Sequence, residues 1–281
     1  MPSVTEVARD NGLWLPVKEL EPKFSYFERT LFEDGAKLNS EEKIDPSVIG
    51  TAVDALTRFL ISRDFDDAFK VSRLGTIWGL TFAQDFISGS ERQRIKIMRE
   101  VTELVDKTMA KIKSAIKGLD EKSILLACYL CSFDRYYRRG GAYNPKNHEL
   151  PRDRASVQNI RTYVKRSLDF FADRGEIMCG VDFPEEAFGS KVTNGDGDYL
   201  TSDTLWEMKT VRENTLKKSA PNYIRQLLIY WRMCCHSEDD FFEDIKRIGI
   251  FNPRSNTAYT LALSEIPEGL IRHIDEVIIG Y

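Results

Sequence analysis

The stretch RRGGAYNPKNHELPRDR, residues 138–154, separates two halves of the chain that have different hydrophobic patterns. It is rich in glycine, proline, asparagine and charge, a composition that interrupts helices and strands. Before it, apolar residues recur at the three- and four-residue spacings of helices; after it, helical patterns alternate with short strand-like runs. This order predicts an α/β fold, in which a small mixed sheet flanked by helices follows an all-helical region. We therefore expect a helical domain over residues 1–140 and an α/β domain over residues 141–281.

The first half is expected to contain four helices, over residues 46–64, 66–86, 90–118 and 121–137. Asp45 and Pro46 are typical of a helix start, and Gly118 is typical of a helix end. The fourth helix is largely apolar, so its two cysteines, Cys128 and Cys131, are interpreted as buried thiols.

The second half begins with an amphipathic helix over residues 156–175, for which Ser156 is a plausible N-cap and Gly175 lies just past the end. The remaining elements follow in chain order. They are a strand-like run at 176–183, an acidic run at 195–210, a helix at 222–234, a hairpin at 247–263 and a last helix at 268–279.

The composition narrows the class of protein. No segment approaches the roughly 18 uncharged apolar residues that a membrane span requires, so we expect no membrane association. The N-terminal residues lack the basic start and apolar run of a secretory signal. Five cysteines are an odd number at low density, which favours a reducing cytoplasm over a disulfide framework. The formal charge of −4 does not indicate nucleic-acid binding, although an acidic protein can carry a local basic face.

One basic segment is visible between residues 134 and 166. It contains nine lysines and arginines against three acids, a local balance of +6, with four tyrosines interleaved. Basic groups beside aromatic rings suit contacts with the backbone and bases of nucleic acid, although a solvated loop and helix face explains the same residues. The candidates for nucleic-acid contact are Arg135, Arg138, Arg139, Arg161 and Lys165, with Arg212, Lys217 and Arg225 further along the chain.

Residues 195–210, GDGDYLTSDTLWEMKT, bring acidic side chains close together. The run LWEMKTV has the β-branched and aromatic residues of a strand, and a two-residue turn at Ser202 and Asp203 would make the stretch a hairpin. In that register Asp198 lies directly opposite Glu207. Because side chains alternate along a strand, Lys209 then shares the face of Glu207. A slip of one residue would move Asp198 to the other face.

Directly opposed side chains have Cβ atoms about 4.5–5.5 Å apart, so two carboxylates there repel unless a cation lies between them. The pattern favours a divalent metal site in which Asp198, Glu207 and the backbone carbonyl of Met208 supply oxygens, and oxygen ligands favour Mg²⁺ or Mn²⁺. Lys209 can orient a water or stabilise a transition state. Asp196 is either a further acid of the metal site or an acid at the edge of a turn. The alternative for the whole motif is a surface hairpin with an incidental Glu–Lys pair.

The next expected helix adds a second motif. Gln226 and Tyr230 are four residues apart and therefore share one helical face. In order, Asp198, Glu207-x-Lys209 and Gln226-x-x-x-Tyr230 resemble the restriction-endonuclease-like, PD-(D/E)xK nuclease superfamily, most closely its RecB/Cas4-like branch, whose signature ends in a Q-x-x-x-Y helix. The resemblance covers roughly residues 155–263.

The resemblance implies a restriction-endonuclease-like core and Mg²⁺- or Mn²⁺-dependent hydrolysis of DNA phosphodiester bonds, in defence against foreign DNA or in DNA repair. It implies that Asp198 and Glu207 bind the metal, that Lys209 is catalytic, and that Gln226 and Tyr230 support the site or contact the substrate. Some relatives hold an iron–sulfur cluster, but the cysteine spacing of this chain differs from theirs and we expect none.

A rival interpretation keeps the fold without the chemistry. The chain would then be a catalytically inactive nucleic-acid-binding or scaffold subunit of a larger complex. Under either interpretation, the helical half is a candidate surface for a homodimer or for a protein partner.

Overall fold

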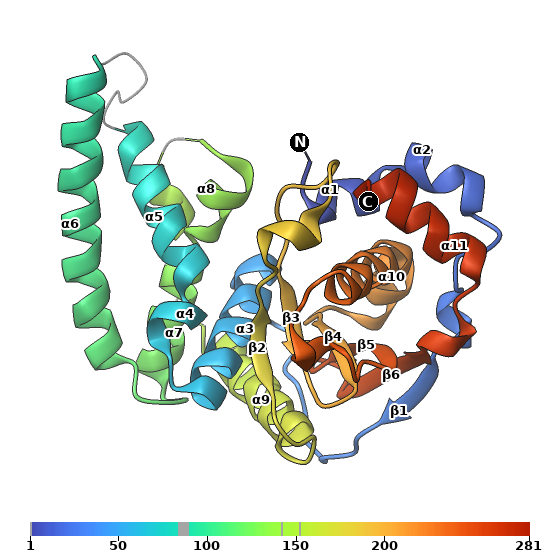
Figure 1. The fold of residues 1–281 in the computed structure, drawn as a ribbon. Helices are drawn as coiled ribbons and strands as arrows, with labels where there is room; N and C mark the ends of the chain where they lie inside the picture. The colour runs from blue at the N-terminus through green and yellow to red at the C-terminus, as the bar shows by residue number, and fades with distance from the viewer. Residues whose placement is uncertain (1, 84–89, 142, 152) are drawn as a thin grey trace. The chain divides into compact units, whose positions relative to one another are not determined.

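The computed structural model describes residues 2–83, 90–141, 143–151 and 153–281 (Figure 1). The chain forms two compact units. The first, here the sheet unit, combines Met1–Asp34 with Asp169–Tyr281, and the second, here the helical unit, is Gly35–Leu168. These units differ from the expected domains 1–140 and 141–281, because residues 1–34 belong to the sheet unit and residues 141–168 belong to the helical unit. Residues 84–86 of the second expected helix and Arg152 of the basic segment lie outside the described residues.

The sheet unit is built on six strands in the order β1-β6-β5-β4-β3-β2. Strands β4 and β5 run parallel, and every other neighbouring pair is antiparallel. This mixed sheet with its helices confirms the predicted α/β class. The strands are β1 (Glu28–Leu31), β2 (Met178–Val181), β3 (Gly197–Leu200), β4 (Thr204–Met208), β5 (Arg247–Asn252) and β6 (Thr257–Ala262).

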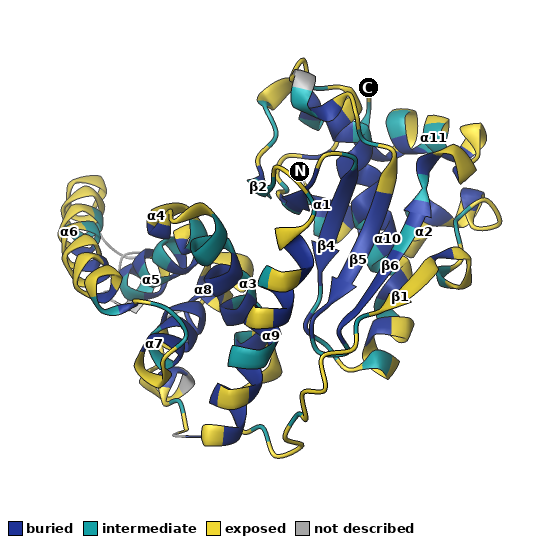
Figure 2. Ribbon diagram, turned by 90° about the horizontal axis from the view of Figure 1, so that it is seen from below, coloured by how far each residue is buried: buried dark blue, intermediate teal, exposed yellow. Residues whose placement is uncertain are grey.

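Helices cover both faces of the sheet. Helix α10 (Glu213–Cys235) contacts β4 and β5 and shares one apolar core with Leu205 and Ile250. It begins well before the expected residue 222. On the opposite face, Phe170 at the end of α9 (Arg154–Ala172) stacks on Phe251 with ring centroids 3.9 Å apart and meets Trp206 edge-on at 4.9 Å. Alternation along β4 therefore directs Leu205 and Trp206 to opposite layers, as expected for a strand covered on both faces. Figure 2 shows these strands as buried.

The N-terminal residues complete the sheet unit in a way that the sequence analysis did not predict. Helices α1 (Val4–Arg9) and α2 (Asn11–Trp14) precede β1, which pairs with β6 at the edge of the sheet. Helix α1 packs on α10, and the buried Trp14 indole donates a hydrogen bond to the carbonyl of Val7. Both ends of the described chain thus contribute to one core. The last expected helix, over residues 268–279, is confirmed as one continuous helical segment that changes from α-helix in α11 (Glu268–His273) to π-helix in η8 (Ile274–Ile279).

The helical unit contains the helices expected from the sequence, with three corrections. The predicted helix over residues 66–86 divides at Phe69 into helices over Phe65–Ala68 and Lys70–Ala83. The predicted helix over residues 121–137 divides near Phe133, and Ser156 is not an N-cap. Helix α9 instead starts at Arg154, and the carboxylate of Asp153 accepts hydrogen bonds from the N–H groups of Ala155 and Ser156. The elements are α3 (Pro46–Ser62), α4 (Phe65–Ala68), α5 (Lys70–Ala83), α6 (Glu91–Ala115), α7 (Glu121–Cys131), α8 (Asp134–Arg139) and most of α9.

Close packing of α5 on α8 accounts for the break near Phe133 between α7 and α8. A Cβ at Gly75 would lie 2.2 Å from the carbonyl oxygen of Phe133, and one at Gly79 would lie 2.7 Å from the ring of Tyr136. Glycine lets α5 approach the backbone at Phe133 at the first position and the ring of Tyr136 at the second. The same contact buries Asp134, whose carboxylate accepts a hydrogen bond of 2.6 Å from the hydroxyl of Ser72. The expected burial of Cys128 and Cys131 is confirmed.

Asp134 predicts a pH dependence of stability. Burial raises the pKa of this carboxyl from 3.8 to about 6. Because the folded-state pKa is the higher one, the protonated form contributes stability fully below pH 3.8 and loses it as the pH rises through 6. The contribution is at most about 3 kcal/mol. Asp134→Asn should remove this slope, measured as urea-unfolding free energies at pH 4.5 and 7. An identical slope in the variant would contradict the assignment.

Candidate active site

The hairpin of β3 and β4 has the predicted register. Tyr199 lies opposite Trp206 and Leu200 opposite Leu205, and the N–H of Thr201 donates to the carbonyl of Thr204 at 3.0 Å. Ser202 and Asp203 are therefore the two turn residues. One further pair in this register brings Asp198 opposite Glu207, on the face of the sheet that α10 covers.

The side chain of Lys209 joins the two acids. Its ammonium group forms an ion pair with Glu207 Oε1 and lies 3.8 Å from Asp198 Oδ2. The same Asp198 oxygen accepts a hydrogen bond of 2.8 Å from the N–H of Met208. All three charged side chains thus meet on one face, as the alternation predicts. Met208, whose carbonyl is the expected third metal ligand, contacts Asp198 through its backbone N–H.

Burial makes this charge cluster electrostatically unusual. Glu207 is 3% exposed, and its burial, together with the negative charge of Asp198, raises its pKa to about 7 despite the ion pair with Lys209. Burial alone would lower the pKa of Lys209, but attraction to Glu207 and Asp198 outweighs it and raises that pKa above its ordinary value. Lys209 therefore stays positively charged at neutral pH, while Glu207 is poised to bind or release a proton.

The acidic side chains of the cluster supply some, but not all, of the oxygen ligands of a hard divalent cation such as Mg²⁺. Across residues 2–83, 90–141, 143–151 and 153–281, no group of three or more His, Cys, Asp or Glu side chains could hold a metal ion. The cluster instead offers two opposed carboxylates, and the exposed Asp196 adds negative charge that raises the pKa of Glu207. Mg²⁺ suits such a pair, because it is usually bound by one or two carboxylates and keeps several waters.

Helix α10 brings further predicted residues to the same side of the sheet. The half-buried Gln226 donates from Nε2 to the hydroxyl of Thr5 at 2.8 Å. The ring of Tyr230 is buried and stacks on Phe183, with centroids 5.6 Å apart. Tyr230 also abuts the loop before β3, because a Cβ at Gly195 would lie 3.0 Å from its ring. Gln226 and Tyr230 thus share a face, as predicted.

The sequence did not predict two residues that contact members of the candidate site. Tyr223 fitted the packing stripe of the helix, yet its half-buried ring centre lies 5.3 Å from the ammonium of Lys209, within the range of a cation–π contact. Thr5 comes from α1, whose start is visible in the sequence as a capping box, because Ser3 and Glu6 exchange hydrogen bonds between side chain and backbone. That signal predicts a helix but not its partner.

The eight predicted nucleic-acid contacts are divided between the two units. Arg212 and Lys217 are exposed at the start of α10 in the sheet unit. Arg225 is 7% exposed; its guanidinium binds both carboxylate oxygens of Glu21 and donates to the carbonyl of Ala8. Because the chain itself occupies this guanidinium, the geometry argues against the expected role of Arg225. The other five, Arg135, Arg138, Arg139, Arg161 and Lys165, belong to the helical unit.

The basic segment of the helical unit is anchored by a buried histidine. His148 Nδ1 lies 2.6 Å from the hydroxyl of Ser132, and Nε2 lies 3.0 Å from that of Tyr136. Ser132 itself donates to the carbonyl of Tyr129, so a neutral His148 donates from Nδ1 and accepts at Nε2. Burial lowers the pKa of His148 to about 4, which keeps the ring neutral. Arg135, Arg138 and Arg139 remain exposed beside it on α8.

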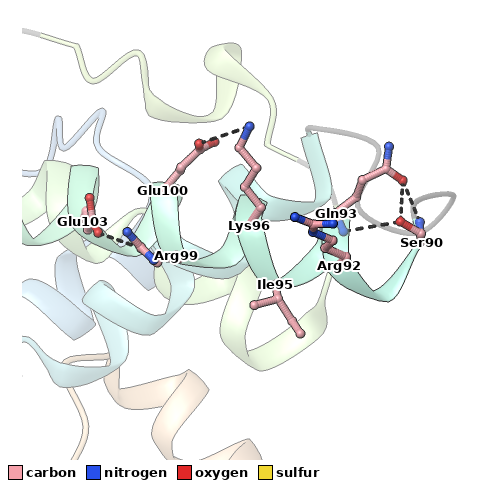
Figure 3. A pocket seen from close by; sticks show the side chains of 8 residues that line it. All are labelled: Ser90, Arg92, Gln93, Ile95, Lys96, Arg99, Glu100 and Glu103. Carbon is pink, nitrogen blue, oxygen red and sulfur yellow. Dashed lines mark hydrogen bonds and ion pairs between the residues drawn. The ribbon is translucent and has the colours of Figure 1, made fainter.

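A separate groove of about 880 Å³ runs along the start of α6 (Figure 3). Its charges largely pair with each other: Lys96 lies 3.8 Å from Glu100, and Arg99 lies 3.2 Å from Glu103. Ile95 on the same surface is 64% exposed. These paired charges on one helix give no arrangement that suits catalysis.

No family model, curated protein or solved structure matches this chain. Among the helices of the described segments, none is both long and apolar enough to cross a membrane. The charge cluster must therefore be interpreted from its own geometry.

Lys209 should be essential to the stability of the cluster. Lys209→Met removes the partner of the buried Glu207 and should lower the unfolding free energy by about 3 kcal/mol at pH 8. The loss should shrink as the pH falls, because the unpaired carboxyl, with its pKa raised further, then takes up a proton. Urea unfolding at pH 6 and 8 measures both effects.

Two variants control for this prediction. Lys217→Met removes an exposed lysine 3.7 Å from Glu213, and it should change the unfolding free energy by less than about 1 kcal/mol. The double variant Glu207→Gln/Lys209→Met removes the fully buried charge that Lys209→Met leaves unpaired, and it should recover much of the loss. Equal losses in Lys209→Met and Lys217→Met would contradict the importance of the buried pair.

Proposed function

We propose that this protein is a Mg²⁺- or Mn²⁺-dependent nuclease that hydrolyses DNA phosphodiester bonds. The observation that carries the proposal is the meeting of Asp198, Glu207 and Lys209 on one sheet face, with the two carboxylates opposed across adjacent strands. Two opposed acids, one of them buried, repel each other and are costly in a hairpin with a purely structural role. The raised pKa of Glu207 reflects its burial and then the negative charge of Asp198.

Asp198 and Glu207 are the residues that would hold the metal, with the backbone carbonyl of Met208 as a third oxygen ligand and Asp196 as a further nearby acid. The bound ion would neutralise charge on the scissile phosphate and make a water more nucleophilic. Lys209 keeps its proton and offers a fixed positive charge beside the phosphate. The ring of Tyr223 lies 5.3 Å from the ammonium of Lys209. In this proposal Gln226 and Tyr230 support the site or contact the substrate strand.

The order of elements supports a restriction-endonuclease-like core for the sheet unit. Helix α9 precedes the antiparallel strands β2, β3 and β4, and α10 then leads to β5 beside β4. A small mixed sheet with helices on its faces is the core that the motif implies. In this proposal Arg212 and Lys217 on the exposed start of α10 contact the nucleic-acid backbone, and the basic groups of α8 and α9 add a second surface. A role in defence or repair and a cytoplasmic location belong to the same proposal.

One observation favours the rival function, a catalytically inactive nucleic-acid-binding or scaffold subunit. The cluster supplies only two carboxylates for a metal, and Lys209 neutralises part of their charge. In that case the ion trio would hold the hairpin together, and the helical unit would bind a protein partner or a second copy.

Cleavage assays test the nuclease directly. Wild-type protein should degrade DNA with Mn²⁺ and not with EDTA, and Asp198→Ala, Glu207→Ala and Lys209→Ala should each reduce the rate by at least about a hundredfold. The variants' circular dichroism checks that the fold is retained. Comparison of linear, circular and single-stranded DNA shows whether free ends are needed. Full activity in folded Asp198→Ala and Lys209→Ala would refute the assignment.

Thermal denaturation separates the nuclease from the rival without requiring a substrate. A ligand that binds only the folded state raises the unfolding free energy by about 2.7 kcal/mol at a hundred times its dissociation constant. Mg²⁺ or Mn²⁺ should therefore raise the melting temperature of wild type and not that of Asp198→Asn/Glu207→Gln. An equal response of the two proteins would favour the scaffold.

A further inference from the structure

Residues 2–9, here called the strap, are hydrogen-bonded to two segments next to the candidate site, the loop before β3 and helix α10. The N–H of Val4 donates to the carbonyl of Asn194 at 3.0 Å, and the N–H of Thr193 donates to the carbonyl of Pro2 at 3.2 Å. These bonds join the strap to the loop that leads into β3 and Asp198. The hydrogen bond from Gln226 to Thr5 joins it to α10. The strap therefore joins these two segments.

Gln226 lies along α10 between a residue that contacts the site and a residue that contacts the loop before β3. Tyr223, three positions earlier, approaches the ammonium of Lys209, and Tyr230, four positions later, abuts Gly195. Residues three and four apart share one face of a helix. Gln226 thus lies on the α10 face between the catalytic lysine and the loop before Asp198, and its side-chain contact is Thr5 of the strap.

We propose that Thr5 is a positioning residue that fixes the amide of Gln226 for the reaction. This inference rests on the proposed nuclease function. A glutamine side chain has several rotatable bonds, and fixing it in advance removes an entropic cost from the transition state. With one N–H bound to Thr5, the amide keeps its second N–H and its oxygen to contact the scissile strand.

The strap does not depend on this one hydrogen bond for its own position. Val4 is fully buried and Val7 is 3% exposed, so apolar packing holds the helix against the core. Arg225, the neighbour of Gln226, donates to the carbonyl of Ala8 and to the side chain of Asn11. Thr5→Val should therefore remove the acceptor for Gln226 while the strap stays docked.

The test uses the full-length chain and steady-state cleavage of DNA with Mn²⁺. Thr5→Val should lower kcat by about tenfold and leave KM within about twofold, because orientation acts on the transition state. Thr5→Ser restores a hydroxyl and should recover kcat. Ser3→Ala is the matched control, because it removes the cap of the same helix without touching Gln226. It should lower the melting temperature, and it should lower kcat less than Thr5→Val does.

A double-mutant cycle identifies the route of the effect. Thr5→Val added to Gln226→Leu should cost nothing further, because the first residue acts through the second. A second readout does not depend on activity: the side-chain amide signal of Gln226 in ¹⁵N-labelled protein, assigned by its loss in Gln226→Leu. It should shift in Thr5→Val and keep its position in Thr5→Ser and Ser3→Ala.

The outcomes distinguish the two proposals. Cleavage by wild type, with additive losses in the double variant or with an equal kcat loss in Ser3→Ala, would overturn the positioning role and leave the nuclease intact. An unmoved Gln226 amide signal in Thr5→Val would also overturn the positioning role. A folded wild type that cleaves no DNA with either metal would overturn the nuclease and the positioning role together.

Discussion

The balance of three charges on one sheet face governs the candidate site. Glu207 is buried opposite Asp198, an arrangement that costs free energy unless a positive group lies close to both. Lys209, the residue after β4, supplies that group. The two-residue turn fixes the register of the hairpin, and alternation places Lys209 on the same face as Glu207. In the proposed nuclease, a divalent cation would take over the two carboxylates, and Lys209 would then be able to face the substrate.

Helix α10 connects this cluster to the rest of the sheet unit. Its apolar side covers β4 and β5, and its polar side contacts the N-terminal residues through Arg225 and Gln226. The buried Arg225 illustrates how context decides the role of a charge. Its sequence neighbours are those of a surface helix, yet Glu21, two hundred residues earlier, binds its guanidinium at 2.6 Å.

Local signals predicted the hairpin, its register and the face shared by Glu207 and Lys209, because alternation and turn length are properties of a few adjacent residues. They also predicted the α/β class. They failed where distant contacts decide the structure. The break between α7 and α8 depends on the approach of Gly75 to Phe133, and the start of α9 depends on Asp153 rather than Ser156. The strap and β1 were missed because short elements are held mainly by tertiary packing.

The pairing of Glu28 with Thr260 joins residues from opposite ends of the described chain, and the whole helical unit lies between them in sequence. During synthesis the helical unit emerges complete while α1, α2 and β1 still lack the sheet that they pack on. Non-local pairing of this kind is slow to form. We therefore expect the helical unit to fold early on the ribosome and the charge cluster to form last. A chain arrested before α10 would already contain Asp198 and Glu207 but would lack the helix that buries them.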